Sequence, residues 1–510
     1  MVVPKSSRAR RILGGWSVNI LQMLLSLTQQ IILVPVFLHY WSVDTLGAWF
    51  AIMAAGNLVL VADAGIHAWS LNRFLSFKSS DDCDRQTVSY YGTALRLYLW
   101  LAAAFAVLIL LAAQFVHPSI ALRFSNQPDF DIAFLAMTVG AVLALPANLA
   151  VALYRARGLY GRVVGIQCWT MAIAQLGQLV GIALTGSLLV VVAAYVAGQI
   201  VYAIYIMAYD ARRQLPFLRE LRQVKLSWPW AVSQLRGAFP FGVMNITELV
   251  LAYAPVLLVS AFVTDRVLVA QWALVRTIAS LLRGLCVQMT LPLAAELGHD
   301  YVMGMKEQLR SLYSRGSLLL TLFASVVTSG AIVFWSDFFA IWTHGTIPDN
   351  PVLMMTLLIG TCVGAPSVLA LSYANYSNRG YLLLWTKSLQ LLIFLLLSLT
   401  LIPRLGPMGA AVAVISSDIA VQSGILSTFM MRETLQHPMR HASILIGVMA
   451  TVVPAGAIMG EAIRYLLPGA GVAHFVVECA LWLVAVALLA SPLTNKPIRT
   501  RLVEAASHSA

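Results

Sequence analysis

Charged residues inside long apolar runs are the strongest chemical signal in this chain. Arg276 and Arg283 lie seven residues apart in one such run, which places both on one face of a helix. Glu248 lies in the preceding run, and Asp418 lies in a run further along the chain. A charge at the centre of a bilayer costs roughly 2.5–3.5 kcal/mol, so such residues tend to face a cavity or a partner. We predict that Arg276, Arg283 and Glu248 bind substrate and that Asp418 couples or gates; a structural Arg276–Glu248 ion pair is the alternative.

A second candidate pair is Asp63 and His67. Their spacing of four residues places them one turn apart on one helical face. A carboxylate beside an imidazole can share or pass a proton near neutral pH. We therefore predict a coupling or gating role for both. The alternative is that Asp63 ends the buried part of the helix and His67 reaches the membrane interface.

The first apolar run contains amides in place of charges. Asn19 and Gln22, with Gln29 and Gln30 further on, fall roughly on one face. Such a face suits the wall of a site for a hydroxyl-rich substrate. Hydrogen bonds between helices explain the same pattern equally well.

Enzyme chemistry finds no support in the sequence. There is no phosphate-binding G-x-x-x-x-G-K-[ST], no H-E-x-x-H and no G-x-S-x-G. The five cysteines are odd in number and widely spaced, and they fit neither a metal site nor a disulfide framework. We predict a protein that is not an enzyme and has neither a metal nor a cofactor, with transport coupled to H⁺ or Na⁺.

Membrane-spanning helices must position these residues. Only 11% of the 510 residues are charged, against roughly 25% in soluble proteins, and 60% are hydrophobic. Apolar runs of about 20 residues recur along the whole chain, and their number predicts an all-α polytopic membrane protein of about fourteen transmembrane helices. The first run, 14–37, is too long for a signal peptide, so we expect an uncleaved span.

The basic residues fix an orientation. The net charge is +12, and most lysines and arginines fall in alternate connectors together with both termini. Positively charged connectors stay in the cytoplasm, so we expect cytoplasmic N- and C-termini. No basic run interleaved with aromatic residues indicates nucleic-acid binding. The residues that we assign to the opposite side are Arg123, Arg266, Arg404 and Arg464.

An internal repeat divides the chain. Prolines and glycines recur in matching sequence contexts at an offset of 220, and two tryptophans recur at 223. Spans 1–6 and 7–12 therefore resemble two parallel copies of one six-helix unit, an arrangement that places a substrate site between the copies. We predict an N-lobe at 1–210, a C-lobe at 237–432, and two extra C-terminal helices with a cytoplasmic tail at 433–510. The pairs are Pro35 and Pro255, Pro146 and Pro366, Gly186 and Gly406, and Trp49 and Trp272.

The repeat carries two further expectations. In the connector 211–236, leucines alternate with arginines and Trp228 and Trp230 follow, which predicts a cytoplasmic amphipathic linker helix on the lipid surface. A solvated linker is the alternative. The offset of 220 also makes Asp63 and Arg283 roughly equivalent, so we expect them to form a latch between the lobes.

Several segments resemble one known family. LVPVFLHYWSVDTLGAWFAIMAAGNLVLVADAGI is similar to the start of bacterial polysaccharide flippases of the Wzx type, with a proline-ended first span, a G-x-W and a D-x-G. QWALVRTIASLLRGLCVQMTLPLAAELG is similar to their eighth span, and RLGPMGAAVAVISSD to their G-x-x-G-A-A stretch. The resemblance implies the multidrug/oligosaccharidyl-lipid/polysaccharide exporter superfamily, with a MATE- and MurJ-like fold of two six-helix lobes.

The function implied by this resemblance is lipid flipping in the bacterial inner (plasma) membrane. An undecaprenyl-pyrophosphate-linked oligosaccharide would cross from the cytoplasmic to the periplasmic leaflet by alternating access, with Arg276 and Arg283 binding the pyrophosphate or acidic sugars. Membrane lipid and polysaccharide polymerase machinery are the implied partners. Many Wzx proteins have twelve spans, and fourteen also resembles the lipid II flippase branch, whose extra pair borders a lipid groove. A lipid II-type flippase and a multidrug antiporter are the alternatives, and two arginines disfavour the cationic substrates of the antiporter.

Overall fold

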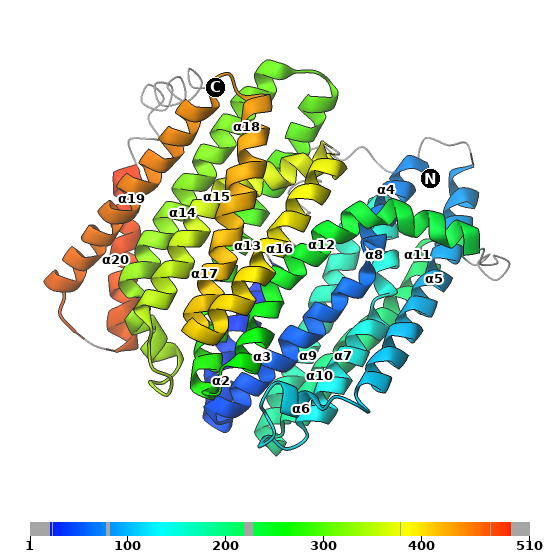
Figure 1. The fold of residues 1–510 in the computed structure, drawn as a ribbon, viewed down its shortest axis with the longest axis horizontal. Coiled ribbons are helices and arrows are strands. Elements are labelled where there is room, and N and C mark those ends of the chain that lie inside the picture. Colours follow the sequence, from blue (N-terminus) through cyan, green and yellow to red (C-terminus); the bar gives the residue numbers. More distant parts are fainter. Residues whose placement is uncertain are drawn as a thin grey trace. The chain divides into compact units, whose positions relative to one another are not determined.

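The computed structural model describes residues 21–490 except 23, 78–81, 219–227, 378 and 470, and within these ranges every regular element is helical (Figure 1). The first half contains η1 (Thr28–Ile32), α2 (Leu33–Tyr40), α3 (Val43–Leu58), η2 (Val59–Asp63), α4 (Ile66–Ser76), α5 (Cys83–Ala112), α6 (Pro118–Ala121), α7 (Phe130–Ala144), α8 (Ala147–Ala156), α9 (Tyr160–Thr185), α10 (Leu188–Ile204), η4 (Tyr205–Asp210), α11 (Ala211–Gln214) and α12 (Trp228–Phe262). The second half contains α13 (Arg266–Val302), α14 (Lys306–Trp342), α15 (Pro351–Tyr376), α16 (Gly380–Leu405), α17 (Pro407–Ser417), η6 (Asp418–Ser427), α18 (Thr428–Thr434), α19 (Pro438–Leu466) and α20 (Val472–Ala490).

Thirteen helical segments among the described residues are long and apolar enough to cross a membrane. They correspond to every span predicted from the sequence except the first. The predicted fold class, an all-α polytopic membrane protein, is therefore confirmed. The predicted first span, 14–37, lies partly outside the described residues, and η1 and α2 form its described second half. The chain is a multi-pass membrane protein.

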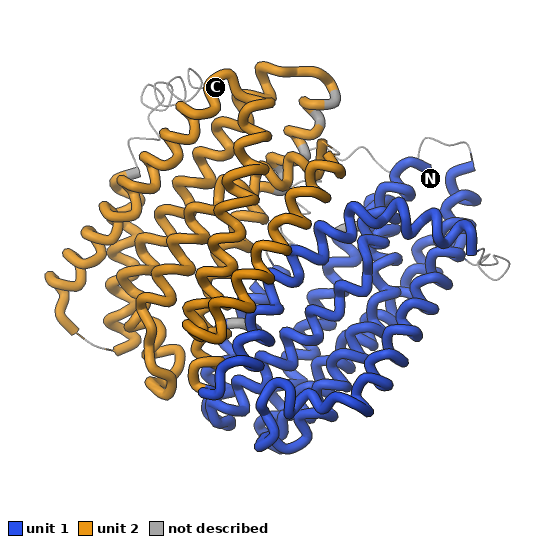
Figure 2. The backbone as a smooth tube through the Cα atoms, viewed as in Figure 1, with its two compact units in different colours: residues 1–266 blue, residues 267–510 orange. Residues whose placement is uncertain are grey.

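The chain forms two compact units, residues 1–266 and 267–510 (Figure 2). Unit 1 includes α12, which packs on α3 and α4, although the sequence repeat placed this helix at the start of the C-lobe. The interior of unit 1 is a cluster of buried residues from α4, α5, α8, α9 and the α10–η4 helix.

The predicted surface helix at 211–236 needs correction. Leu215 and Leu218 are 6% and 1% exposed and belong to the buried cluster of unit 1, so they do not face lipid. Residues 211–214 form the short α11, and α12 already begins at Trp228. An apolar face of a helix can be buried either against lipid or against the protein interior, and here the leucines are buried in the protein. Residues 219–227 of this segment lie outside the described residues.

The second span is broken where Asp63 ends η2. Ala64 and Gly65 take left-handed conformations with φ of 47° and 78°, and α4 begins at Ile66. Asp63 and His67 therefore do not share a face of one continuous helix, although the His67 backbone N–H still donates to the Asp63 carboxylate across the break. Their predicted coupling or gating role stays a prediction. The break is covered by α12, whose Gly242 approaches the backbone at 64–65 so closely that a Cβ there would lie 2.6 Å from the Ala64 carbonyl oxygen.

Unit 2 carries the two C-terminal helices on its side. α19 and α20 run along α14 (Figure 1). Small residues allow this close approach: a Cβ on Gly330 of α14 would meet the ring of Trp482, and a Cβ on Gly456 of α19 would meet Ser329. Trp482 also donates a 3.0 Å hydrogen bond from its Nε1 to the Gly456 carbonyl. Close packing through small residues is how membrane helices associate.

The helix boundaries follow the sequence repeat. α9 and α16 begin at 160 and 380 and end at 185 and 405, at the offset of 220. Gly186 and Gly406 both have positive φ, 62° and 57°, just before the next helix. That next helix contains a π-helical segment in both units, η4 and η6. α3 and α13 begin at 43 and 266, which matches the tryptophan offset of 223. These observations support the predicted duplication.

The close approach of α12 to the break predicts that Gly65→Ala destabilises the protein. An added Cβ would lie 2.3 Å from the Gly242 nitrogen, and a left-handed conformation costs a residue with a Cβ roughly 1–2 kcal/mol. We expect a lower midpoint of thermal unfolding in detergent. Gly284→Ala is the control, because a Cβ there has no neighbour within 4 Å. Equal midpoints for both variants would contradict this packing.

Candidate functional site

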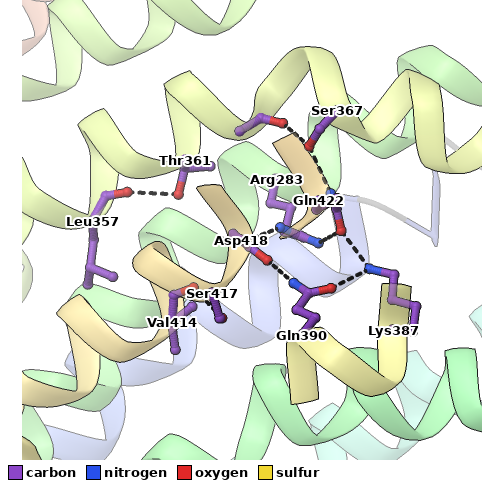
Figure 3. Close-up of polar contacts among 11 residues, drawn as sticks. Arg283, Leu357, Thr361, Ser367, Lys387, Gln390, Val414, Ser417, Asp418 and Gln422 are labelled. Carbon is purple, nitrogen blue, oxygen red and sulfur yellow. Dashed lines mark hydrogen bonds and ion pairs between the residues drawn. The ribbon is translucent and has the colours of Figure 1, made fainter. Parts of the chain in front are cut away.

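An ion pair inside unit 2 forms the centre of the candidate site (Figure 3). Arg283 of α13 donates from Nη1 to Asp418 Oδ2 at 2.7 Å. Their side chains are 25% and 15% exposed. Asp418 also accepts a hydrogen bond from the Gln390 side-chain amide at its other oxygen. Both carboxylate oxygens therefore have a donor inside the bundle.

Lys387 of α16 brings a second cation to the site. Its Nζ donates to Gln422 Oε1 at 2.6 Å and to Gln390 Oε1 at 2.8 Å, and the residue is only 1% exposed. Gln422 in turn donates from Nε2 to Ser367 Oγ at 2.9 Å. We call this set the polar network of unit 2. Its members are Arg283, Ser367, Lys387, Gln390, Asp418 and Gln422.

The local helix geometry explains how four elements meet at this point. Asp418 and Gln422 are four residues apart in η6, and Lys387 and Gln390 are three apart in α16, so each pair projects from one face. η6 is π-helical over ten residues, and π segments within helices are frequent at functional sites. The network joins α13, α15, α16 and η6, and it contains two cations and one carboxylate.

The structure thus brings together two pairs of the predicted residues. Arg283 binds Asp418, and the Asp63 carboxylate accepts a hydrogen bond from the backbone N–H of His67. Arg276 and Glu248 are partly buried in α13 and α12, which belong to different units. Their roles and their pairing stay predictions. Arg283 binds Asp418 within its own unit, and the predicted latch between Arg283 and Asp63 also stays a prediction.

The predicted residues of unit 1 have partners of their own. Asp63 is 8% exposed and accepts a hydrogen bond from the Tyr98 hydroxyl. His67 lies 2.8 Å through Nδ1 from the Asn148 carbonyl oxygen, which can only accept, so Nδ1 carries the proton. Gln22 is helical and partly buried. Asn19 lies outside the described residues.

The sequence interpretation missed Lys387. We assigned it to the basic cytoplasmic connector, although it lies seven residues after Gly380, where α16 begins. The sequence did contain a signal for Lys387. Gln390 follows it by one helical turn, just as Gln422 follows Asp418 by one turn. Polar side chains one turn from an intramembrane charge are candidates for its partners.

A second buried ion pair was also missed. Asp210 of η4 is 0% exposed and binds Arg162 of α9 through both oxygens, at 2.6 and 2.9 Å. Tyr154 donates to it at 2.6 Å. Both charges stand close to predicted span ends, where we expected cytoplasmic surface. The triad joins α8, α9 and η4, and bidentate geometry makes it a strong structural tie.

An apolar groove of about 550 Å³ adjoins the polar network in unit 2. Its walls come from α14, α15, η6 and α19, the first of the two extra helices. Ser367 belongs to both features, since it lines the groove and accepts from Gln422. The α19 side of the groove consists of Ala442, Leu445, Ile446, Met449, Ala450, Val453 and Pro454.

Metal chemistry has no visible site. Among the described residues, no three His, Cys, Asp or Glu side chains are placed to hold a metal ion. All five cysteines are free.

Comparison with solved structures identifies the fold. The lipid II flippase MurJ in an inward closed conformation superposes with a TM-score of 0.68 at 11% identity, covering 94% of this chain and 99% of its own. An inward-facing MATE family multidrug transporter of the MOP superfamily gives 0.63 at 13% identity, covering 85% of this chain and 99% of its own. A mutant of the Vibrio cholerae MATE transporter VcmN gives 0.56 at 16% identity, covering 83% and 97%. No family model and no curated protein sequence matches the chain.

The chain has the fold of MOP-superfamily transporters. This confirms the MATE- and MurJ-like fold expected from the sequence resemblance. At 11–16% identity the likeness concerns the fold alone.

The ion pair at the centre of the network predicts a large effect of Asp418→Asn. Removing one partner of a buried pair costs about 3–5 kcal/mol because a charge is left uncompensated, and partial exposure of Arg283 favours the lower end. We expect a clear fall in the midpoint of thermal unfolding. The double variant Arg283→Gln with Asp418→Asn should recover part of the loss, since neither charge remains. The single variant Arg283→Gln completes the cycle. A double variant whose loss of stability equals or exceeds the sum of the losses in the two single variants would show that the pair is not coupled.

Proposed function

We propose that this protein flips a polyprenyl-pyrophosphate-linked oligosaccharide from the cytoplasmic to the periplasmic leaflet of the bacterial inner membrane. The observation that carries the proposal is the apolar groove of unit 2 and its contact with the polar network at Ser367. A groove with apolar walls suits a polyprenyl chain. The guanidinium of Arg283 and the ammonium of Lys387 suit the charge of a pyrophosphate.

The same features argue against a small organic cation as substrate. The six residues of the network include two cations and one carboxylate, a composition that favours an anionic ligand over a cationic one. The extra helix α19 also supplies one wall of the groove. The two MATE structures compared above match 85% and 83% of this chain, whereas MurJ matches 94% of it. That difference is close in size to the α19–α20 pair.

A lipid II-type substrate is the second candidate, because MurJ is a lipid II flippase by name and matches almost the whole chain. Both candidates share a pyrophosphate-linked lipid and differ in the head group. We keep cytoplasmic termini, coupling to H⁺ or Na⁺, and association with polysaccharide polymerase machinery as parts of the proposal. Catalysis is not part of it.

The groove predicts that a bulky side chain at Ala450 blocks transport. Purified protein in proteoliposomes should move a fluorescent polyprenyl-pyrophosphate-linked disaccharide between leaflets, measured by its accessibility to a membrane-impermeant quencher. Ala450→Trp should slow this movement at least tenfold, because Ala450 lines the groove. Ala455→Trp is the matched control, since Ala455 is also an exposed alanine of α19 but does not line the groove.

Three results would count against the proposal. Wild-type protein that moves a small organic cation but no lipid-linked sugar would indicate an antiporter. Movement of lipid II alone would favour the second candidate. Equal rates for Ala450→Trp and Ala455→Trp would remove the groove from the transport path.

A further inference from the structure

Unit 1 contains an uncharged pocket of mixed polar and apolar lining that the proposed transport site does not use. It has a volume of about 270 Å³, is partly open, and is lined by residues of η1, α3, η2, α7, α8, α9 and α10. None of its lining residues, all in the described part of the chain, carries a formal charge. Its polar side chains include Asn57, Gln167, Thr170, Gln178, Gln199 and Tyr202.

Gln178 gives this pocket unmet hydrogen-bonding capacity. The residue is 0% exposed, and neither its Nε2 nor its Oε1 has a hydrogen-bond partner among the described residues. The hydroxyl of Tyr202, which also lines the pocket, is in the same state. Burying a polar group without a hydrogen-bond partner destabilises the folded protein. A ligand with both donors and acceptors would remove that destabilisation.

The repeat shows that the pocket and the polar network of unit 2 occupy equivalent places. At the offset of 220, or 223 in the α3 and α13 pair, each network residue has a counterpart in unit 1. All six counterparts line the pocket. The pairs are Arg283 and Leu60, Ser367 and Ala147, Lys387 and Gln167, Gln390 and Thr170, Asp418 and Gly198, and Gln422 and Tyr202.

One interior position is therefore built in two ways. In unit 2 it is filled by charged and amide side chains that bind one another. In unit 1 smaller or uncharged residues leave it open, most clearly where Gly198 replaces the carboxylate and Leu60 replaces the guanidinium. The same correspondence revises an earlier expectation, because helix starts pair Arg283 with Leu60 and not with Asp63.

The lining decides which ligand fits. A pyrophosphate, a metal ion or an organic cation would bring a charge into a partly desolvated pocket whose lining offers no opposite charge. An acyl chain would leave the amides unsatisfied. A sugar hydroxyl both donates and accepts, as do side-chain amides and tyrosine hydroxyls. The volume lies just below the roughly 300–1,000 Å³ of small-molecule pockets, which suits one sugar ring.

We propose that the interior pocket of unit 1 binds one neutral sugar residue through Gln178 and its polar neighbours. The proposal names part of the saccharide recognised by the flippase and in that respect rests on the proposed function. Gln178→Met is the informative variant, because methionine keeps the volume and removes both polar atoms. A merely structural glutamine would leave sugar binding unchanged.

The test is saturation-transfer NMR on the full-length protein in detergent. The probes are free glucose, galactose, mannose and N-acetylglucosamine, with glucuronate as a charged comparison. We expect saturation transfer to at least one neutral sugar, weaker transfer to glucuronate, and at least a tenfold loss of binding in Gln178→Met. Its unfolding midpoint should stay at or above that of the wild type, since an unsatisfied amide has been removed.

Ser398→Ala is the matched control. Ser398 lies 220 residues after Gln178, is 0% exposed, and its hydroxyl also has no hydrogen-bond partner among the described residues. It should bind sugar as the wild type does. If Gln178→Met does not fold, Thr170→Val tests the same pocket with an isosteric change and should weaken binding.

Two results would overturn the pocket assignment: no neutral sugar binds the wild type, or the pocket variants bind as the wild type does. The assay of movement between leaflets distinguishes failure of the pocket assignment from failure of the proposed flippase function. Flipping without sugar binding would refute the pocket alone. Sugar binding that is lost in Gln178→Met, in a protein that moves no lipid-linked sugar, would refute the flippase and keep the pocket.

Discussion

The structure depends on one constraint: polar groups inside membrane-spanning helices must be satisfied by the bundle itself. The Arg283–Asp418 pair with its amides meets this constraint in unit 2, and the Arg162–Asp210–Tyr154 triad meets it in unit 1. Each set ties three or four helices together, because its side chains come from three or four different elements. The helices are held at these points by specific hydrogen bonds and elsewhere by close packing of small residues.

The two units meet this constraint to different degrees at equivalent positions of the repeat. The charged network fills the interior of unit 2 and adjoins an apolar groove lined by α19. The equivalent place in unit 1 is an uncharged pocket with an unsatisfied Gln178. The two units thus offer different chemistry, cationic beside apolar in one and neutral hydrogen bonding in the other. An amphiphilic substrate with a lipid chain, a pyrophosphate and sugars contains all three kinds of group.

Much of the fold could be predicted from the sequence, because hydropathy and connector charge define spans almost independently of tertiary structure. Pairs of network residues such as Arg283 and Asp418 were singled out for the same reason. Lys387 was missed because its charge fitted a basic connector. The break at Gly65 was missed because apolar residues continue across it, and the close packing of Gly242 against it is a tertiary contact between distant parts of the sequence. Leu215 and Leu218 were predicted to face lipid but are buried in unit 1. The sequence could not distinguish the two, since lipid and the protein interior both favour leucine.

The central claim is that the lipid part of the substrate lies in the groove lined by α19, beside the Arg283–Asp418–Lys387 network. An experimental structure of the full chain in lipid nanodiscs, with and without an added polyprenyl-pyrophosphate-linked disaccharide, tests it most directly. Our account predicts additional chain density along Leu445, Met449 and Val453 that appears only with the substrate. Density for the substrate elsewhere, with the groove unchanged between the two samples, would contradict it.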